Sequence, residues 1–228
     1  IWRLWLQGED NAPDVCKACL ASLRRWYPEK EIITLDKDNF SNYVTLPDWI
    51  NLKHEQGIID NTKYSNLVRL QLLIEHGGIW VDSTAFFTGR QSEHLMHLPL
   101  FAFRLWQFAD VPSNWFLVSD AHNPILTLIR DLHFEYWKRY DYFVHYFIFH
   151  MFFLMAIEKY PEEWSNVPFI YDNVNHDMQR SRYEDYSDEK MKSLTDACDI
   201  HKLTYGLKDG IQPSPSSIFQ HVIDTYLH

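Results

Sequence analysis

Residues 76–86 read HGGIWVDSTAF, and this stretch decides the fold because a helix must end and a strand must begin within it. The preceding apolar residues recur at helical spacing, which predicts a helix over residues 61–76. Gly77 can take the left-handed conformation that ends a helix, and Gly78 allows the chain to reverse tightly. The run IWVD then predicts a strand over residues 79–82.

The turn brings a group of polar side chains to one end of that strand. A strand rises about 3.3 Å per residue and a helix about 1.5 Å, so Arg69 should lie level with Asp82. Asn66 lies three residues before Arg69 on the same helix face, with Ser65 beside it. An ion pair that closes the turn would explain Arg69 and Asp82 structurally. Alternatively, the four polar groups bind a ligand, because open α/β sheets bind ligands outside the carboxyl ends of their strands.

A nucleotide-sugar suits these groups chemically. An aspartate at a strand end can hold a ribose hydroxyl or a divalent cation that neutralises a diphosphate. Arginine and amide groups on the neighbouring helix can bind sugar hydroxyls. If the cluster binds a ligand, its chemistry favours a phosphorylated sugar donor, whereas the ion-pair interpretation requires no ligand; the residues alone leave both open.

The rest of the chain predicts an α/β sheet. Residues 1–6 and 31–35 read as strands on either side of a helix at 13–27, and this order with short connections predicts a parallel pair. Further strands are expected at 101–106 and 115–120. Further helices are expected at 48–55, 123–139 and 143–160.

Two later segments differ sharply in polarity. Residues 142–157 are strongly apolar but carry His145 and His150, and they are shorter than the ~20 residues of a spanning helix. A buried helix is expected there, with an interfacial membrane contact as the alternative. The tail from residue 161 is polar, and its charged run at 180–190 predicts a solvated loop or helix face.

Composition narrows the class of protein. The chain has 228 residues, 46% of them hydrophobic, which is enough for one substantial core. Its formal net charge of −10 argues against a nucleic-acid partner, because phosphates would be repelled. A phosphorylated ligand would need local help from a metal ion, a few cations or helix N-termini.

The three cysteines do not suggest a disulfide framework. Cys16 and Cys19 form a C-x-x-C with no second pair that could complete a zinc site. Both are expected to pack inside the first helix face as small apolar side chains. Since no leader peptide is visible, we expect a reduced, cytoplasmic protein.

Residues 65–86, SNLVRLQLLIEHGGIWVDSTAF, resemble the S-D-x-x-R…G-G-I-(W/Y)-x-D core of GT-A glycosyltransferases in the capsular polysaccharide synthesis family. That family is akin to certain mannosyltransferases and to the large clostridial glucosylating toxins. The likeness extends to IWRLWLQGEDNAP at the start, LPDWI at 46–50 and HKLTY at 201–205. It implies a GT-A type α/β fold, a Rossmann-like sheet flanked by helices with extra helices in the C-terminal half. It also implies one domain over 1–228, with a nucleotide-sugar half at 1–90 and an acceptor half at 91–228.

The resemblance implies roles residue by residue. Trp5 would flank the base, Asp82 would hold the ribose and the metal shell, and Arg69 would contact the transferred sugar and the diphosphate. Asn66, Arg69 and Asp82 are the implied catalytic residues. The implied nucleotide-sugar-binding residues are Trp5, Leu6, Gln7, Gly8, Ser65, Asn66, Arg69, Asp82, Ser83, Lys202 and Thr204.

Two positions depart from the most common pattern of these relatives. Asn66 stands where the family usually has an aspartate, and an amide can bind hydroxyls but cannot act as nucleophile or base. Thr84 stands where the toxins have the second acid of D-x-D. Asp82 and Thr84 would therefore hold Mn²⁺ or Mg²⁺ weakly. Lys202, Thr204 or, less readily, His221 would supply a later ligand or phosphate contact.

The implied activity is retaining transfer of a hexose from a UDP-sugar, UDP-glucose or UDP-galactose, to a saccharide or lipid-linked oligosaccharide acceptor. The setting would be capsular or exopolysaccharide synthesis at the inner membrane face. Since Asn66 cannot form a glycosyl-enzyme, a front-face route is expected. The alternative is a non-catalytic module that binds nucleotide-sugar or carbohydrate, which both departures would favour; a structural scaffold is a third.

Other residues near the ends of expected elements are candidates for the acceptor side, namely His150, Asp120 and Asp141. The aromatic stripe within residues 142–153 is expected to belong to the core and not to a sugar platform. Its members are Tyr142, Tyr146, Phe149 and Phe153.

Overall fold

The computed structural model describes residues 1–108, 111–207 and 210–227. At its centre lies a five-stranded mixed sheet of order β2-β1-β3-β6-β5. Its strands are β1 (Trp2–Leu4), β2 (Ile33–Leu35), β3 (Gly78–Val81), β5 (Leu100–Arg104) and β6 (Pro112–Ser119). β1 runs parallel to β2 and β3, which confirms the predicted parallel pair, whereas β6 runs antiparallel to β3 and β5.

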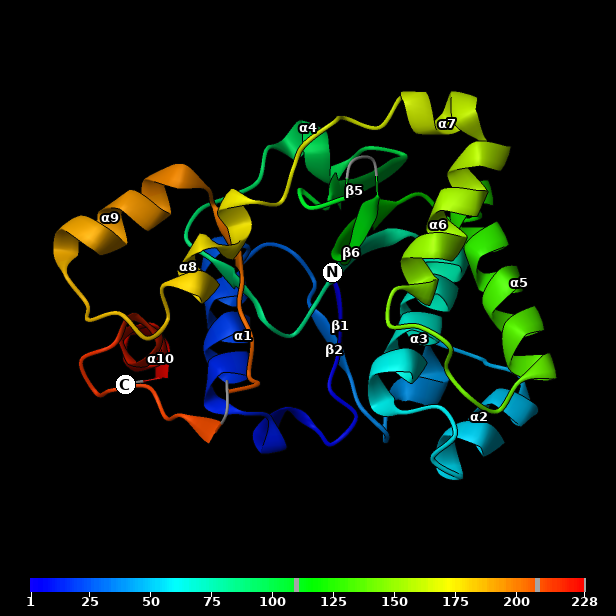
Figure 1. The fold of residues 1–228 in the computed structure, drawn as a ribbon, viewed down its shortest axis with the longest axis horizontal. Helices are drawn as coiled ribbons and strands as arrows, with labels where there is room; N and C mark the ends of the chain where they lie inside the picture. The colour runs from blue at the N-terminus through cyan, green and yellow to red at the C-terminus, as the bar shows by residue number, and fades with distance from the viewer. Residues whose placement is uncertain (109–110, 208–209, 228) are drawn as a thin grey trace.

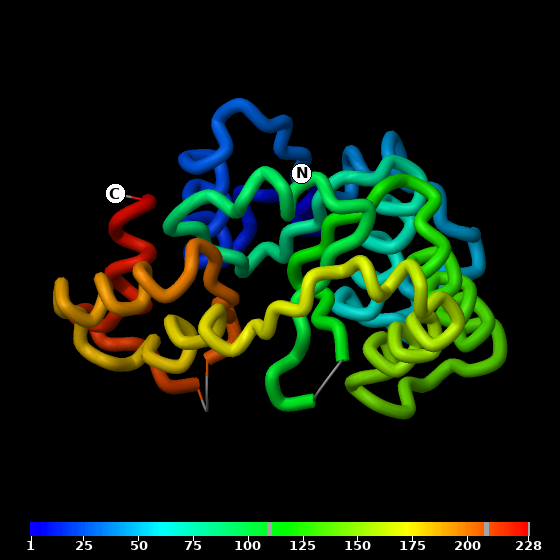
Figure 2. Tube along the Cα trace, turned by 90° about the horizontal axis from the view of Figure 1, so that it is seen from above, coloured from blue at the N-terminus to red at the C-terminus, as the bar shows by residue number. Residues whose placement is uncertain are grey.

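Helices cover the sheet in two groups (Figure 1). One group comprises α2 (Asp48–Glu55), α3 (Asn61–His76), α5 (Pro124–Arg139) and α6 (Ile148–Lys159). The other comprises α1 (Asp14–Trp26), α8 (Asp177–Arg180), α9 (Asp188–Ala197) and α10 (Ile218–Leu227). Figure 2 shows the yellow segment after α6 crossing from the first group to the second.

Several short elements complete the fold. They are α4 (Glu93–Met96), α7 (Pro161–Ser165) and the 3-10 turns η1 (Glu9–Asn11), η2 (Phe40–Asn42) and η3 (Val174–His176). The helices of the polar tail were not expected individually, because charged residues hide the apolar spacing of α9 and the small core beneath it. The mixed α/β architecture itself is as predicted.

A second sheet of two short strands joins distant parts of the chain. β4 (Ala85–Phe87) pairs antiparallel with β7 (Ile200–Lys202). Neither was predicted as a strand, because three residues are too few to display the alternation of a strand. The pairing places Lys202 opposite Ala85, next to the D-S-T motif.

The turn between α3 and β3 is built as expected. Gly77 and Gly78 have φ of 65° and 98°, a region that other residues avoid. A Cβ on Gly77 would lie 2.8 Å from the backbone nitrogen of Ala121, so the chain has no room for a side chain there. The helix begins at Asn61, as predicted, and its N-cap is Asp60, whose carboxylate accepts from the Lys63 N–H at 2.9 Å.

The helix expected over 143–160 begins only at Ile148. The Tyr136 hydroxyl donates to the Tyr142 carbonyl at 2.7 Å and accepts from the Val144 N–H at 3.1 Å. These bonds hold the preceding segment in an irregular path, since they occupy backbone groups that a helix would pair otherwise. No helix in the described parts of the chain is both long and apolar enough to cross a bilayer.

The aromatic stripe divides between core and surface. Phe149 and Phe153 are buried as predicted, but Tyr142 and Tyr146 are 59% and 75% exposed, so the core assignment was wrong for them. They precede α6 and therefore lack its buried face.

Cys16 and Cys19 are buried in a smaller core formed by α1, α9 and α10, which confirms the packing prediction. Burial raises the pKa of the Cys16 thiol to about 11 and that of Cys19 to about 12, so both stay protonated.

Candidate functional site

Asp82 follows directly after β3 and is the centre of a polar cluster. Arg69 Nη2 on α3 donates to Asp82 Oδ1 at 3.0 Å, which confirms that the two lie level. Trp80 Nε1 donates to the same oxygen at 2.9 Å. The sheet also fixes the Asp82 backbone, because its N–H donates to the Trp115 carbonyl at 2.9 Å.

The other carboxylate oxygen faces Lys202 from the second sheet. Lys202 Nζ lies 3.2 Å from Asp82 Oδ2 and donates a hydrogen bond to Thr84 Oγ1. Of the predicted site residues, Arg69, Asp82, Thr84 and Lys202 thus form one connected cluster.

Arg69 is held on its far side by β6. Its Nη1 donates to the Asn114 carbonyl, and Asn114 Nδ2 donates to Asn66 Oδ1 at 3.2 Å. The guanidinium lies 4.8 Å from the centre of the Trp80 ring, within cation–π range. Asn66 is therefore joined to Arg69 through Asn114, and its amide NH₂ makes no hydrogen bond with the described residues.

Charge and burial set the ionisation of the cluster. Burial would raise the pKa of Asp82, but Arg69 and Lys202 outweigh it and bring that pKa below its ordinary value. Burial lowers the pKa of Arg69, an effect that Asp82 opposes, and a guanidinium still remains protonated at neutral pH. Two cations thus face one carboxylate, and the cluster has an excess positive charge.

His150 lies on the same side of the sheet as Arg69. Burial, and then the Arg69 charge, lower the pKa of His150 to about 4, so its ring is neutral at physiological pH. Phe149, the residue before it, lies 6.0 Å from the Arg69 guanidinium. His150 therefore lies close to the cluster, and its role on the acceptor side stays a prediction.

Ser83 ties the first strand to the D-S-T motif. Its Oγ donates to the Leu4 carbonyl at 2.8 Å, and Arg3 Nη2 donates to the Ser83 carbonyl at 2.9 Å. Trp5 follows Leu4, and its ring meets that of Tyr205 edge-on at 5.5 Å. The amino-terminal strand end is therefore adjacent to the motif.

The remaining predicted residues have local roles. Leu6 packs against the core, Gln7 is exposed, and Gly8 has φ of 84° in the turn before η1. Ser65 Oγ donates to the Thr62 carbonyl at 2.8 Å, and Thr204 Oγ1 accepts from the Gly206 N–H at 3.1 Å. None of these five is bonded to Asp82.

Three further candidates lie away from the cluster. Asp120 follows β6, and because β6 is antiparallel to β3 its end lies beside Gly78, opposite the Asp82 end. Asp141 forms an ion pair with Lys53 at 2.6 Å beside α2. His221 stacks on Tyr186, with ring centres 3.7 Å apart, and contacts no residue of the cluster.

Sequence reasoning missed three residues of the site: Trp80, Asn114 and Tyr205. Trp80 could have been found, because it lies two residues before Asp82 on the same face of the strand. Asn114 and Tyr205 could not, since their positions depend on strand pairings between distant segments.

The donor set does not fit a resident divalent cation. Asp82 Oδ1 accepts from Arg69 and Trp80, while Oδ2 and Thr84 Oγ1 are both bonded to Lys202. Within the described ranges no three His, Cys, Asp or Glu side chains are grouped as metal ligands. Mg²⁺ and Mn²⁺ prefer six oxygen ligands, and this cluster offers one carboxylate and one hydroxyl.

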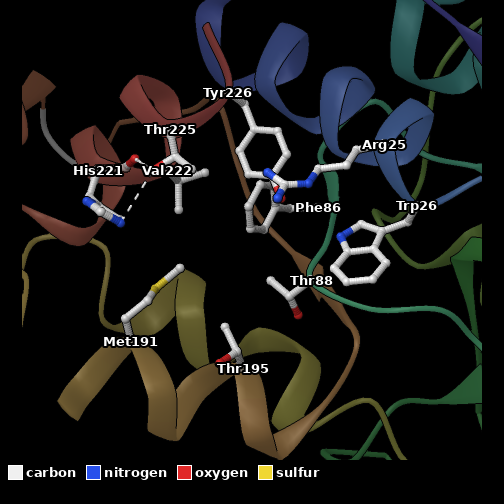
Figure 3. A pocket seen from close by; sticks show the side chains of 10 residues that line it. All are labelled: Arg25, Trp26, Phe86, Thr88, Met191, Thr195, His221, Val222, Thr225 and Tyr226. Carbon is white, nitrogen blue, oxygen red and sulfur yellow. Dashed lines mark hydrogen bonds between the residues drawn. The ribbon is translucent and has the colours of Figure 1, made fainter. Parts of the chain in front are cut away.

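A separate cavity of about 240 Å³ lies among α1, α9 and α10. Figure 3 shows Phe86, Tyr226, Arg25 and Trp26 lining one side of it and Met191 and Thr195 from α9 lining the other. No residue of the Asp82 cluster lines it, so it is distinct from the candidate site.

Two solved structures resemble this chain in fold. The PaToxG glycosyltransferase matches 86% of this chain and 74% of its own at 12% identity, with a TM-score of 0.50. The apo form of the glycosyltransferase GlyE from Streptococcus pneumoniae TIGR4 matches with 14% identity and a TM-score of 0.54. That match covers 100% of this chain, which spans 60% of GlyE.

No curated protein is similar enough in sequence to match. The model of the capsular polysaccharide synthesis protein family, however, matches residues 1–222, nearly the whole length. The chain has the fold of these glycosyltransferases, and it belongs to the capsular polysaccharide synthesis protein family.

Proposed function

We propose that this chain is a retaining glycosyltransferase that moves a hexose from a UDP-sugar to a saccharide acceptor during capsular or exopolysaccharide synthesis. The observation that carries the proposal is the linked cluster of Arg69, Asp82 and Lys202 at the carboxyl end of β3, in a member of this family. The crevice outside the carboxyl ends of strands is where open α/β sheets bind nucleotides.

Donor binding follows from the charges. Arg69 and Lys202 exceed Asp82 by one positive charge, which favours a diphosphate even though the whole chain carries −10. Trp5, next to the motif through Leu4 and Ser83, would flank the uracil base. Asn66 offers its amide NH₂ to a hydroxyl of the transferred sugar.

The chemistry favours a front-face route. Among the described residues, Asp82 forms ion pairs with both Arg69 and Lys202. Both of its carboxylate oxygens therefore already contact donors. A double displacement needs an available carboxylate below the anomeric carbon, and Asn66 cannot serve as one. Instead, Lys202 and Arg69 stabilise the charge that develops on the departing diphosphate, which accepts the proton of the acceptor hydroxyl.

A coupled assay tests the proposal. The chain is incubated with UDP-glucose or UDP-galactose and a saccharide or lipid-linked oligosaccharide acceptor, with and without Mn²⁺. UDP release is measured, and the product is analysed by NMR. We expect donor-dependent release and an α-glycosidic product.

The outcomes separate the alternatives. A β-linked product would disprove retention but leave transfer intact. Tight UDP-sugar binding without release, even as slow hydrolysis, would instead identify a binding module. The variant Asp82→Asn, in which a neutral amide replaces the acid, is the matched background control for contaminating activity.

A further inference from the structure

Lys202 occupies the space between the two oxygen-bearing side chains of the D-S-T motif. Its Nζ lies 3.2 Å from Asp82 Oδ2 and donates to Thr84 Oγ1. The backbone holds it there, because Lys202 is registered with Ala85 in the second sheet and the Leu203 N–H donates to the Thr84 carbonyl at 2.8 Å. This lysine is therefore a fixed part of the motif, with a side chain only 19% exposed.

A divalent cation would compete with Lys202 for the same oxygens. It would have to displace the ammonium from both Asp82 and Thr84, while Asp82 Oδ1 stays bonded to Arg69 and Trp80. The dication would then lie beside two cations with one carboxylate to offset them. The electrostatics of the cluster thus favour the ammonium.

The ammonium also retains capacity for a ligand. A lysine has three N–H donors, and the bonds to Asp82 and Thr84 account for two of them. The third can donate to an oxygen of a diphosphate, as a charge-assisted hydrogen bond. Lys202 can therefore link the motif to the diphosphate, which is the task of a bridging cation.

We infer that Lys202 takes the place of a divalent cation in this site, so that the chain binds its nucleoside diphosphate donor without metal. The inference rests on the proposed function, since it concerns the diphosphate of the same donor. It differs from the Mn²⁺ or Mg²⁺ dependence that the family resemblance implies.

Calorimetric titration with UDP tests this directly on the full chain. One series contains EDTA and the other contains Mn²⁺. We expect the unaltered chain to bind UDP in EDTA, with a Kd that Mn²⁺ changes by less than about threefold. Lys202→Met should weaken binding in EDTA by roughly tenfold or more, the usual cost of losing a charged hydrogen bond.

Four further measurements keep the result interpretable. Lys192→Met removes an exposed lysine that pairs with Asp196, and should leave the Kd unchanged. Lys202→Arg keeps the charge and should retain binding in EDTA. Thermal unfolding shows that each variant is folded, and an electron paramagnetic resonance titration with Mn²⁺ alone should detect no saturable site in the unaltered chain.

The outcomes distinguish the two levels of the proposal. UDP binding that appears only with Mn²⁺, or a saturable Mn²⁺ site in the unaltered chain, would overturn the inference and leave the proposed transferase standing. A Lys202→Met variant that is folded and binds UDP in EDTA as the unaltered chain does would also overturn it. No UDP binding in either buffer would overturn both.

Discussion

The strand β3 is four residues long, and its two ends depend on different features of the chain. At the Gly78 end, backbone conformation determines which residues are tolerated, because Gly77 and Gly78 have positive φ and no side chain would fit at Gly77. At the other end, side chains decide: Asp82 gathers Arg69 and Lys202 from different elements. One short strand thus separates a position required for folding from one that, in our proposal, acts in transfer. Substitutions at its two ends should therefore show their effects in different assays.

The largest effect is expected at Asp82, which follows the carboxyl end of β3. Asp82→Asn removes the charge that Arg69 and Lys202 share but keeps an acceptor for Trp80. We expect kcat/KM to fall by roughly 10³-fold, the scale for losing a preorganised electrostatic group. UDP release from a UDP-sugar measures it, with circular dichroism to confirm folding. A variant within tenfold of the unaltered chain would reduce Asp82 to a structural ion-pair partner.

The next largest effect is expected at Gly77, before the amino end of β3. Gly77→Ala forces an alanine into an unfavourable backbone region and against the Ala121 nitrogen, so the free energy of unfolding should fall by about 3 kcal/mol. Urea unfolding measures it. Gly57→Ala is the matched control, because Gly57 also has positive φ but open space around its Cβ position, and about 1 kcal/mol is expected there.

Activity per folded molecule should be unchanged in Gly77→Ala. If that variant folded normally yet lost transfer, the division between the two ends of β3 would be wrong.

Sequence reasoning predicted both ends, because both depend on local geometry. The rises of helix and strand place Arg69 beside Asp82, and the observed 3.0 Å contact confirms this. The pair Gly77-Gly78 indicates a helix end and a tight turn directly from the sequence. The parallel pair of β1 and β2 was likewise predictable from the order strand, helix, strand.

Contacts between segments that are far apart in the sequence could not be predicted in the same way. The hydrogen bond from Lys202 to Thr84 spans 118 positions and depends on two strands of three residues each. Family resemblance indicated Lys202 as a neighbour of the diphosphate, but not that it would occupy the oxygens of the metal motif. The location of Asp120 at the opposite end of β3 from Asp82 could not be predicted for a related reason, because the direction of β6 is set by tertiary pairing and not by its own residues.

A smaller effect is expected at Asn66, on the helix beside Asp82. Asn66→Ala removes a side chain that accepts from Asn114 and, in our proposal, binds a sugar hydroxyl. Loss of one hydrogen bond to the donor should lower kcat/KM by roughly tenfold. Glu75→Ala, an exposed substitution on the same helix, should have no effect. Turnover equal to that of the unaltered chain would remove the role of Asn66 and leave the cluster to Arg69, Asp82 and Lys202.

The smallest effect is on stability at low pH. The pKa of Asp82 is lowered in the folded chain because Arg69 and Lys202 outweigh burial, so folding favours its charged form. This contribution is fully present above the unfolded pKa of about 3.9 and is lost as pH falls through the lower folded value. The difference in unfolding free energy between the unaltered chain and Asp82→Asn should therefore be constant at pH 5–7 and shrink below about pH 4. Urea titrations across this range measure it. A difference that instead changed between pH 5 and 7 would mean that Asp82 is protonated in the fold, which would deprive both Arg69 and Lys202 of their counter-charge.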